Sequence, residues 1–386
     1  MNFFRFGSIS LLLLLAVSTA QAEELKRFVL RGGLQTERLH QRARHFRARD
    51  LHHLENTDAD VVEMTASDAK ALRKEFGRGF SIEEDAKVEA LGRPHGQAWW
   101  NNPFLDEARA RQQAISQPAE VLPWGIAAVQ APEAWQYSRG AGIKVCVVDT
   151  GIQKDHPDLA ANIAGGRNFV RMGGSVDKTK WNDDNGHGTH VSGTIAAIDN
   201  SIGVVGVAPL AKIYAVKVLD RNGSGYLSDV AAGIRECVIA GAHVISMSLG
   251  SSGDSSVLHD AVIYAKNAGK VIVAAAGNES GPVLYPAKYS EVWAISAVDK
   301  NLKFASFSNF GPEVDFAAPG VTVYSTVKGS GYAYFSGTSM ATPHVAGIVA
   351  LALSAQTNHV VSQTINGLST DQQGYGFANA YLSVKP

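Results

Sequence analysis

The chain has 386 residues, a nearly balanced charge of 35 Lys and Arg against 36 Asp and Glu, and 45% hydrophobic residues. This length suits two or three domains. The balanced charge argues against a polybasic nucleic-acid binder, and the hydrophobic fraction argues against a disordered chain. Charged residues make up about 28% of residues 1–118 but only about 14% of residues 119–386. The sequence therefore predicts two different kinds of protein joined near residue 118.

The first 22 residues have the pattern of a secretory signal peptide. Arg5 precedes a Leu-rich apolar stretch from Ile9 to Val17, and Ala20-Gln21-Ala22 is a small-x-small cleavage site. The apolar stretch is too short to cross about 30 Å of hydrocarbon. We predict cleavage after Ala22 and export, either to a periplasm or to the medium.

Residues 23–93 are expected to form a small α+β domain. Short strands are predicted at Phe28–Leu30 and Asp60–Met64, and Ser67 is predicted to cap a helix. Residues 94–118 contain several Pro, Trp and Asn residues and have little periodicity, so we predict a linker there.

From residue 119 onward, apolar runs alternate with helices that are rich in small residues. We predict strands at 144–149, 213–219, 244–249, 271–276 and 292–298, and helices at 228–240 and 256–268. This alternation predicts an α/β domain with a mostly parallel central sheet and helices on both faces. Catalytic groups in such folds gather beyond the carboxyl ends of the strands.

The chain contains two cysteines, Cys146 in an expected strand and Cys237 on the apolar face of an expected helix. They could be two small buried hydrophobic residues, or they could form a disulfide between the strand and the helix. The sequence leaves both alternatives open.

Three segments carry unusual residues at the expected strand ends: VVDTG at 147–151, NGHGTHVSGTIAA at 185–197 and SGTSMATPHVAG at 336–347. Asp149 ends a buried strand, and Ser339 lies where a loop enters a helix. Each could simply cap a turn or a helix. A helix start also offers positive potential and free N–H groups to a developing oxyanion.

The middle segment holds two histidines. The glycines around His187 leave it room to face a cleft, whereas His190 is expected to be a buried structural residue. A metal at this pair is not expected, because the glutamate of an HExxH motif is missing. A serine nucleophile needs a base and a third group that orients the base, and Asp149, His187 and Ser339 supply these three types.

These segments resemble the active-site signatures of the subtilisin family of serine proteases, the subtilases. The similarity runs through most of residues 119–386 and includes TIAAIDNSIGVVGVAP at 194–209, SMSLG at 246–250, AAAGNES at 274–280 and FASFSNFGPEVDFAAPG at 304–320. Several motifs in family order are highly specific. Residues 23–93 resemble, more weakly, the propeptide of these enzymes, which is a chaperone and inhibitor.

The resemblance implies a secreted serine endopeptidase that works through an acyl-enzyme intermediate. Ser339 would attack the scissile carbonyl, His187 would transfer the proton, and Asp149 would orient His187. Asn278 matches the oxyanion-hole asparagine of the family. The enzyme would be made as a zymogen that removes its own propeptide near Pro118–Ala119.

The resemblance also implies where substrate binds. Two segments match those that hold an extended peptide between them, namely Ser248, Leu249 and Gly250 on one side and Gly223, Ser224 and Gly225 on the other. Ala275 and Gly277 would line the pocket for the side chain before the cut, with Glu279 at its rim. If Leu284 points inward, the pocket is shallower and favours smaller side chains.

Calcium is the cofactor that the resemblance implies. The ligands would be Glu120, Asp158, the side chain of Asn200, and the carbonyl oxygens of Ile198, Ile202 and Val204. Ca²⁺ takes six to eight oxygen ligands of these kinds. The same resemblance allows a second, weaker site around Ala287, Tyr289, Val292, Glu313 and Asp315.

The rival interpretations of this sequence are a non-catalytic binding module, a dinucleotide-binding protein and a peptide ligase. A non-catalytic binding module is disfavoured because all four catalytic positions carry competent residues, and a dinucleotide-binding protein would need a G-x-G-x-x-G after the first strand. A peptide ligase on the same scaffold stays open, because it uses the same acyl-enzyme. We expect a monomer whose partners are protein or peptide substrates and its own propeptide as an intramolecular inhibitor, with no nucleic acid and no membrane.

Overall fold

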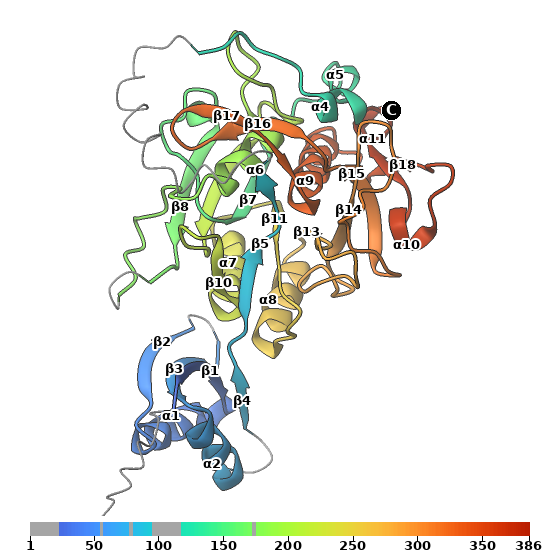
Figure 1. Ribbon diagram of the computed structural model, residues 1–386. Helices are drawn as coiled ribbons and strands as arrows, with labels where there is room; N and C mark the ends of the chain where they lie inside the picture. The colour runs from blue at the N-terminus through green and yellow to red at the C-terminus, as the bar shows by residue number, and fades with distance from the viewer. Residues whose placement is uncertain (1–22, 55–56, 77–79, 95–116, 172–174) are drawn as a thin grey trace, which may run out of the picture.

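The computed structural model describes residues 23–54, 57–76, 80–94, 117–171 and 175–386. The predicted signal peptide and most of the predicted linker lie outside the described residues. The described chain forms a small N-terminal domain and a larger α/β domain (Figure 1). In these ranges we find no helix with the length and apolar character needed to cross a membrane.

The N-terminal domain is a four-stranded antiparallel sheet with two helices, which agrees with the small α+β domain that the sequence predicted. The strands lie in the order β2 (Arg49–His53), β3 (Ala59–Thr65), β1 (Leu25–Arg31) and β4 (Ser81–Glu84), with helices α1 (Thr36–His45) and α2 (Ala66–Phe76) and a short 3₁₀ turn, η1 (Gly33–Gln35). The predicted cap at Ser67 is wrong. The helix already includes this residue, and the hydroxyl of Thr65 accepts the N–H of Asp68 instead.

The two faces of this small sheet pack against different partners, because successive residues of a strand point to opposite sides. On one face Phe28 and Leu30 pack with Leu39 of α1 and Leu72 of α2. On the other face Val29 joins the apolar cluster of the larger domain. The N-terminal domain is therefore docked on the larger domain through a shared core.

The larger domain is built on a nine-stranded sheet. Its order is β18 (Val361–Gln363), β19 (Phe377–Asn379), β15 (Val314–Pro319), β14 (Trp293–Val298), β13 (Val271–Ala275), β11 (Val244–Met247), β7 (Lys144–Asp149), β9 (Lys212–Lys217) and β8 (Ile163–Asn168). All neighbouring strands are parallel except β18 and β19. The predicted α/β fold with a mostly parallel sheet is confirmed.

Helices cover both faces of this sheet, and strand β7 shows why. Val145 and Val147 belong to one apolar cluster, with residues of α6 (His187–Ala196) and α9 (Thr338–Ser354). Cys146 and Val148 belong to the other cluster, with residues of α7 (Leu227–Ile239) and α8 (Ser256–Asn267). A strand that is buried on both faces reads as a continuous apolar run, which is the pattern of this sequence.

The remaining elements are short. They are β5 (Lys87–Ala90), β6 (Arg93–Pro94), β10 (Ser224–Tyr226), β12 (Leu249–Gly250), β16 (Val323–Val327), β17 (Gly331–Ser336), α4 (Trp124–Ala128), α5 (Ala131–Ala134), α10 (Thr370–Gln373), α11 (Ala380–Val384) and the 3₁₀ turn η3 (Ala160–Asn162). The strand predicted at 244–249 is split, because Leu249 and Gly250 leave the central sheet and pair with β5.

The two cysteines are joined. Cys146 of β7 and Cys237 of α7 form a disulfide whose Cα atoms are 5.7 Å apart. Both residues are fully buried. Of the two alternatives that the sequence left open, the structure shows the disulfide between strand and helix.

We predict that the denatured protein has no free thiol before reduction and two after it. In a Ser339→Ala background, which removes the predicted nucleophile and so avoids self-digestion, replacing both cysteines by alanine should lower the free energy of unfolding by about 2–4 kcal/mol. Chemical denaturation measures this loss against Ser339→Ala alone. Thiols that react in the denatured, unreduced protein would contradict the disulfide.

Candidate active site

Asp149 and His187 meet at the carboxyl edge of the central sheet. Asp149 is the last residue of β7 and His187 the first residue of α6, and both side chains are buried. His187 Nδ1 lies 2.8 Å from Asp149 Oδ1 and 3.0 Å from Oδ2. A Cβ on Gly188 would lie 2.1 Å from the carbonyl oxygen of Gly151, so a glycine there lets α6 approach the end of β7 closely.

Ser339 is the second residue of α9 and is fully buried. Its hydroxyl donates to the carbonyl oxygen of Ser248 at 2.9 Å, and the Ser248 hydroxyl donates back to the carbonyl oxygen of Ser339 at 2.9 Å. His187 Nε2 is buried and has no hydrogen-bond partner within the ranges that the structure describes. A rotation about the Cα–Cβ bond of Ser339 is therefore needed to turn its hydroxyl from Ser248 toward His187.

The backbone carbonyl group of Leu91, from the N-terminal part of the same chain, contacts this site. The carbonyl oxygen of Leu91 accepts a hydrogen bond from Asn278 Nδ2 and another from the backbone N–H of Ser339 at 3.3 Å. The side-chain oxygen of Asn278 accepts from the N–H of Thr338 at 2.9 Å and from its hydroxyl at 3.0 Å. These bonds fix the amide so that its nitrogen faces Leu91. Two donors that converge on one carbonyl oxygen can stabilise negative charge on it.

The two segments predicted to hold substrate flank an extended strand. Strand β5 lies antiparallel between β10 and β12, with Glu89 opposite both Ser224 and Gly250. Figure 1 shows β5 reaching from the N-terminal domain into the middle of the larger one. Beyond β5, the N–H of Leu91 donates to the carbonyl oxygen of Ser248 at 3.1 Å. The strand between the two segments therefore belongs to this chain.

The side chain of Leu91 lies beside the predicted specificity pocket. A Cβ on Gly250 would lie 2.7 Å from Leu91 Cδ1 and 3.0 Å from Leu284 Cδ1, so both leucines contact this glycine. Ala275 and Gly277, which are predicted to line the pocket, are buried, whereas Glu279 at its predicted rim is exposed. Its carboxylate accepts from the N–H of Asn278 at 2.9 Å, which ties it to the turn that carries the amide.

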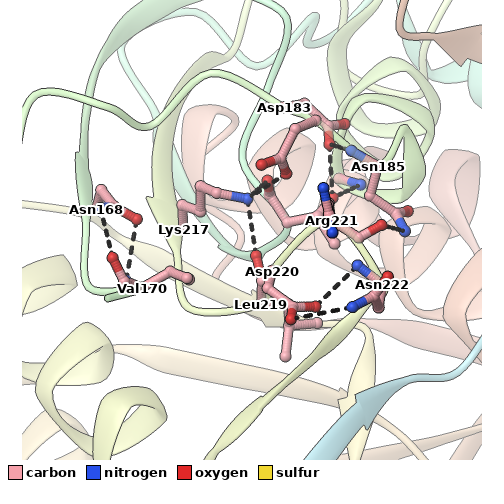
Figure 2. Close-up of polar contacts among 12 residues, drawn as sticks. Asn168, Val170, Asp183, Asn185, Lys217, Leu219, Asp220, Arg221 and Asn222 are labelled. Atoms are coloured by element: carbon pink, nitrogen blue, oxygen red, sulfur yellow. Dashed lines mark hydrogen bonds and ion pairs between the residues drawn. The ribbon is translucent and has the colours of Figure 1, made fainter. Parts of the chain in front are cut away.

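Sequence analysis missed Lys217, which braces the loop before His187. Lys217 is 1% exposed, and its ammonium group donates to the carbonyl oxygens of Thr150 and Leu219 at 2.7 and 2.8 Å and to Asp184 Oδ1 at 2.7 Å. Figure 2 shows it between Leu219 and the loop that carries Asp183 and Asn185. The sequence does contain a signal for this role, namely a lysine within an apolar strand. A charge buried in such a strand needs hydrogen-bond partners.

Sequence analysis also missed Asp183, which is 5% exposed. Its carboxylate accepts five hydrogen bonds, from the hydroxyls of Thr150 and Thr189 and the N–H groups of Asn185, Gly186 and Thr189. Burial raises the pKa of Asp183 in spite of these donors. The side chain of Asn185 accepts the N–H of His187 at 3.1 Å, so this cluster sets the backbone position of His187.

His190 lies apart from this site, as expected. It is fully buried, its Nε2 lies 3.1 Å from the carbonyl oxygens of Val323 and Ala333, and its ring stacks on Phe335 with centroids 4.3 Å apart. Burial lowers the pKa of His190 to about 3, so it is neutral at ordinary pH.

The predicted calcium ligands lie together at a second place. Asp158 accepts from Asn200 Nδ2 at 2.8 Å and from the N–H of Val204 at 2.9 Å, while Glu120 accepts from the N–H of Asn200 at 2.8 Å. Burial, with the charge of Glu120 close by, raises the pKa of Asp158 to about 6.

This donor set fits a cation that prefers oxygen. A buried carboxylate with a raised pKa would gain from a bound cation, and the loop adds amide and carbonyl oxygens. The side-chain oxygen of Asn200 accepts the N–H of Ile202 at 2.6 Å, so the amide must turn before this oxygen can face the same point as Asp158. No group of three acidic, His or Cys side chains suited to a metal occurs among the residues described. A metal here would depend on neutral oxygens.

Comparison with known proteins gives one family match and several matches to individual proteases. The sequence profile of the Subtilase family matches residues 140–379. The thermostable alkaline protease of Halalkalibacterium halodurans is 51% identical over 270 residues, which cover 67% of this chain and 72% of that protein. Subtilisin Savinase of Lederbergia lenta is 48% identical over 277 residues, covering 69% of this chain and 100% of that protein.

A longer match reaches the N-terminal domain. The M-protease of Shouchella clausii is 43% identical over 335 residues, which cover 86% of this chain and 79% of that protein. Because residues 119–386 are too few to account for such a match, the similarity includes part of the chain before residue 119.

We predict that Lys217→Met lowers the free energy of unfolding by about 2–4 kcal/mol, because two buried carbonyl oxygens lose their donor. The matched control is Lys303→Met, at an exposed lysine in the turn after β14, where the loss should stay within about 0.5 kcal/mol. Chemical denaturation in the Ser339→Ala background measures both. Equal losses would show that the buried contacts of Lys217 carry no special weight.

Proposed function

We propose, from the premise that this chain belongs to the subtilase family of serine endopeptidases, that Asp149, His187 and Ser339 are its catalytic triad. The observation that carries the proposal is the carbonyl group of Leu91, which receives hydrogen bonds from Asn278 and Ser339. A peptide carbonyl held by two donors beside a serine and a histidine is the arrangement that acyl transfer requires.

In the proposed mechanism the Ser339 hydroxyl turns from Ser248, gives its proton to His187 Nε2 and attacks the carbonyl carbon of the substrate. Asp149 holds His187 in the right orientation and stabilises the imidazolium that forms. His187 then gives the proton to the leaving amine. Water hydrolyses the acyl-enzyme by the same route in reverse.

Asn278 and the backbone N–H of Ser339 would stabilise the oxyanion. A side-chain donor of this kind is worth about 10²–10³ in turnover, a value that comes from subtilisin, a member of the same family. Thr338 would act as a positioning residue, because it holds the oxygen of the Asn278 amide and so directs the nitrogen.

We propose that protein and peptide substrates bind in extended form. They would lie between Gly223–Gly225 and Ser248–Gly250, as β5 does. The side chain before the cut would enter a pocket lined by Ala275, Gly277 and Leu284. The closeness of Leu284 to Gly250 supports a shallower pocket that favours smaller side chains.

We also propose that the enzyme is exported and is made as an inhibited precursor. The signal-peptide pattern and the disulfide both suit an oxidising compartment. The N-terminal domain would be the inhibitor, since β5 lies where substrate would lie. We propose that the enzyme acts as a monomer, which a site assembled within one chain supports.

Charged contacts support docking of the inhibitor domain. Asp85 accepts from the N–H and hydroxyl of Ser228 at the start of α7, and Glu83 accepts from the N–H of Ser256 at the start of α8. Carboxylates are favourable at helix N-termini. Arg27 is buried between Asp85 and Asp229, at 3.0 and 3.3 Å.

Calcium is the proposed cofactor. Glu120, Asp158, Asn200 and the carbonyl oxygens of Ile198, Ile202 and Val204 would hold it. When bound, the ion would supply charge that neutralises two carboxylates and would stabilise the loop. It would take no part in the acyl transfer.

The function is tested with a fluorophosphonate probe. Mature protein should be labelled at Ser339, Ser339→Ala should not be labelled, and the active form should release new α-amino groups from casein. An unlabelled protein, or equal labelling of Ser339→Ala, would disprove the triad. Joined peptides in place of new amino groups would favour a ligase.

For calcium, we predict that a chelator lowers the melting temperature of the Ser339→Ala protein by about 10 °C, because a ligand at 1,000 times its Kd adds about 4 kcal/mol. The variant that also carries Asp158→Ala should melt at the same temperature with and without chelator. A chelator that leaves the first protein unchanged would remove calcium from the proposal.

A further inference from the structure

We propose that the enzyme first cuts its own chain between Leu91 and Gly92, and that residues 92–118 stay attached to the catalytic domain after this cut. The inference rests on the proposed triad. It replaces the cleavage near Pro118–Ala119 that the sequence predicted.

The first observation is the position of Leu91. Its carbonyl oxygen receives the hydrogen bonds of Asn278 and Ser339. Its side chain contacts Gly250 at the proposed specificity pocket and is only 6% exposed. Leu91 therefore has both the carbonyl position and the side-chain position of a residue that precedes a cut.

The second observation is the position of Gly92. A Cβ on this residue would lie 2.8 Å from His187 Nε2 and 3.0 Å from Met340 Sδ. Gly92 therefore lies against the histidine nitrogen that must give a proton to the leaving amine, and the fit depends on the missing side chain. A larger residue would push the chain or the histidine out of place.

The chain is also held after the bond. Strand β6 begins at Arg93 and pairs antiparallel with β17, where Arg93 lies opposite Ser336 and Pro94 opposite Phe335. With β5 held between β10 and β12, backbone pairing fixes the chain on both sides of the bond between Leu91 and Gly92. This is the arrangement of an uncut substrate.

The predicted junction at Pro118–Ala119 lies at another place. The carbonyl oxygen of Pro118 accepts from the N–H of Gly203 at 2.8 Å, Ala119 forms a bridge to Ile202, and the N–H of Val121 donates to Gly203 at 2.8 Å. These contacts belong to the proposed calcium loop. They exist while Leu91 occupies the active site, so a cut after Leu91 need not disturb them.

The step balances within one chain. The Ser339 oxygen bonds to the carbonyl carbon of Leu91, the bond from that carbon to the Gly92 nitrogen breaks, and the serine proton passes through His187 to the new amine of Gly92. Water then hydrolyses the ester and leaves a carboxylate on Leu91.

The test follows the full chain after synthesis by intact mass and N-terminal sequencing at two protein concentrations. The first catalytic fragment should begin at Gly92, the released fragment should end at Leu91, and the rate should be the same at both concentrations. Ser339→Ala should stay uncut.

Two variants test the fit. Gly92→Ala should slow the first cut at least about tenfold, since small misplacements at a reacting centre are costly. The matched control Gly331→Ala, where a Cβ would lie in ordinary contact 3.7 Å from Val327 Cγ2, should leave the rate of the first cut unchanged. If Gly92→Ala fails to fold, Leu91→Asp tests the same bond, because a charge in an apolar pocket should slow the cut by a similar factor.

The outcomes separate the two proposals. A first fragment that begins at Ala119 and still depends on Ser339 would overturn the Leu91–Gly92 bond and leave the triad standing. An unchanged rate in both Gly92→Ala and Leu91→Asp would also overturn it. Cutting that proceeds in Ser339→Ala, together with failure of fluorophosphonate labelling, would overturn the proposed function itself.

Discussion

The contact between Asp149 and His187 is the interaction on which the rest of the site depends. Both side chains are buried, so their relative position must be set by other buried groups. Lys217 and Asp183 do this from opposite ends, since one binds the turn after β7 and the other binds the turn before α6. The large parallel sheet brings these groups to one edge, and its small-residue helices allow the close approach.

Short strands outside the central sheet give the site a second property, which is that they can pair with an extended backbone. Strands β10 and β12 leave a space that is one strand wide, and β17 offers another edge beyond the serine. Backbone pairing can bind any extended chain. Selectivity among sequences must therefore come from the pocket beside Gly250 and from the size of the residue that lies against His187. The segment of this chain that occupies the space meets both requirements, with Leu91 on one side and Gly92 on the other.

Local sequence patterns predicted the parallel sheet, the burial of His190, and an aspartate, a histidine and a serine as candidate site residues. Each of these features depends on residues close together in the sequence. The position of Leu91 could not be predicted in this way. The residues around Leu91 and Gly92 look like the end of any strand. The register of β5, which places Leu91 in the site, depends on pairing with residues more than a hundred positions away. The role of Lys217 was missed for a related reason, since two of its three partners, Thr150 and Asp184, come from other segments of the chain.

The strand β5 is covalently linked to the site that it fills, and under the proposed inhibition this link would govern how strongly the N-terminal domain blocks the enzyme. In the intact chain the effective concentration of the domain at the site is set by the tether and does not change with dilution. Once the chain is cut, the domain is a separate molecule, and the fraction of enzyme that it blocks follows its bulk concentration. If export and inhibition are as proposed, dilution of the cut domain outside the cell would be enough to activate the enzyme.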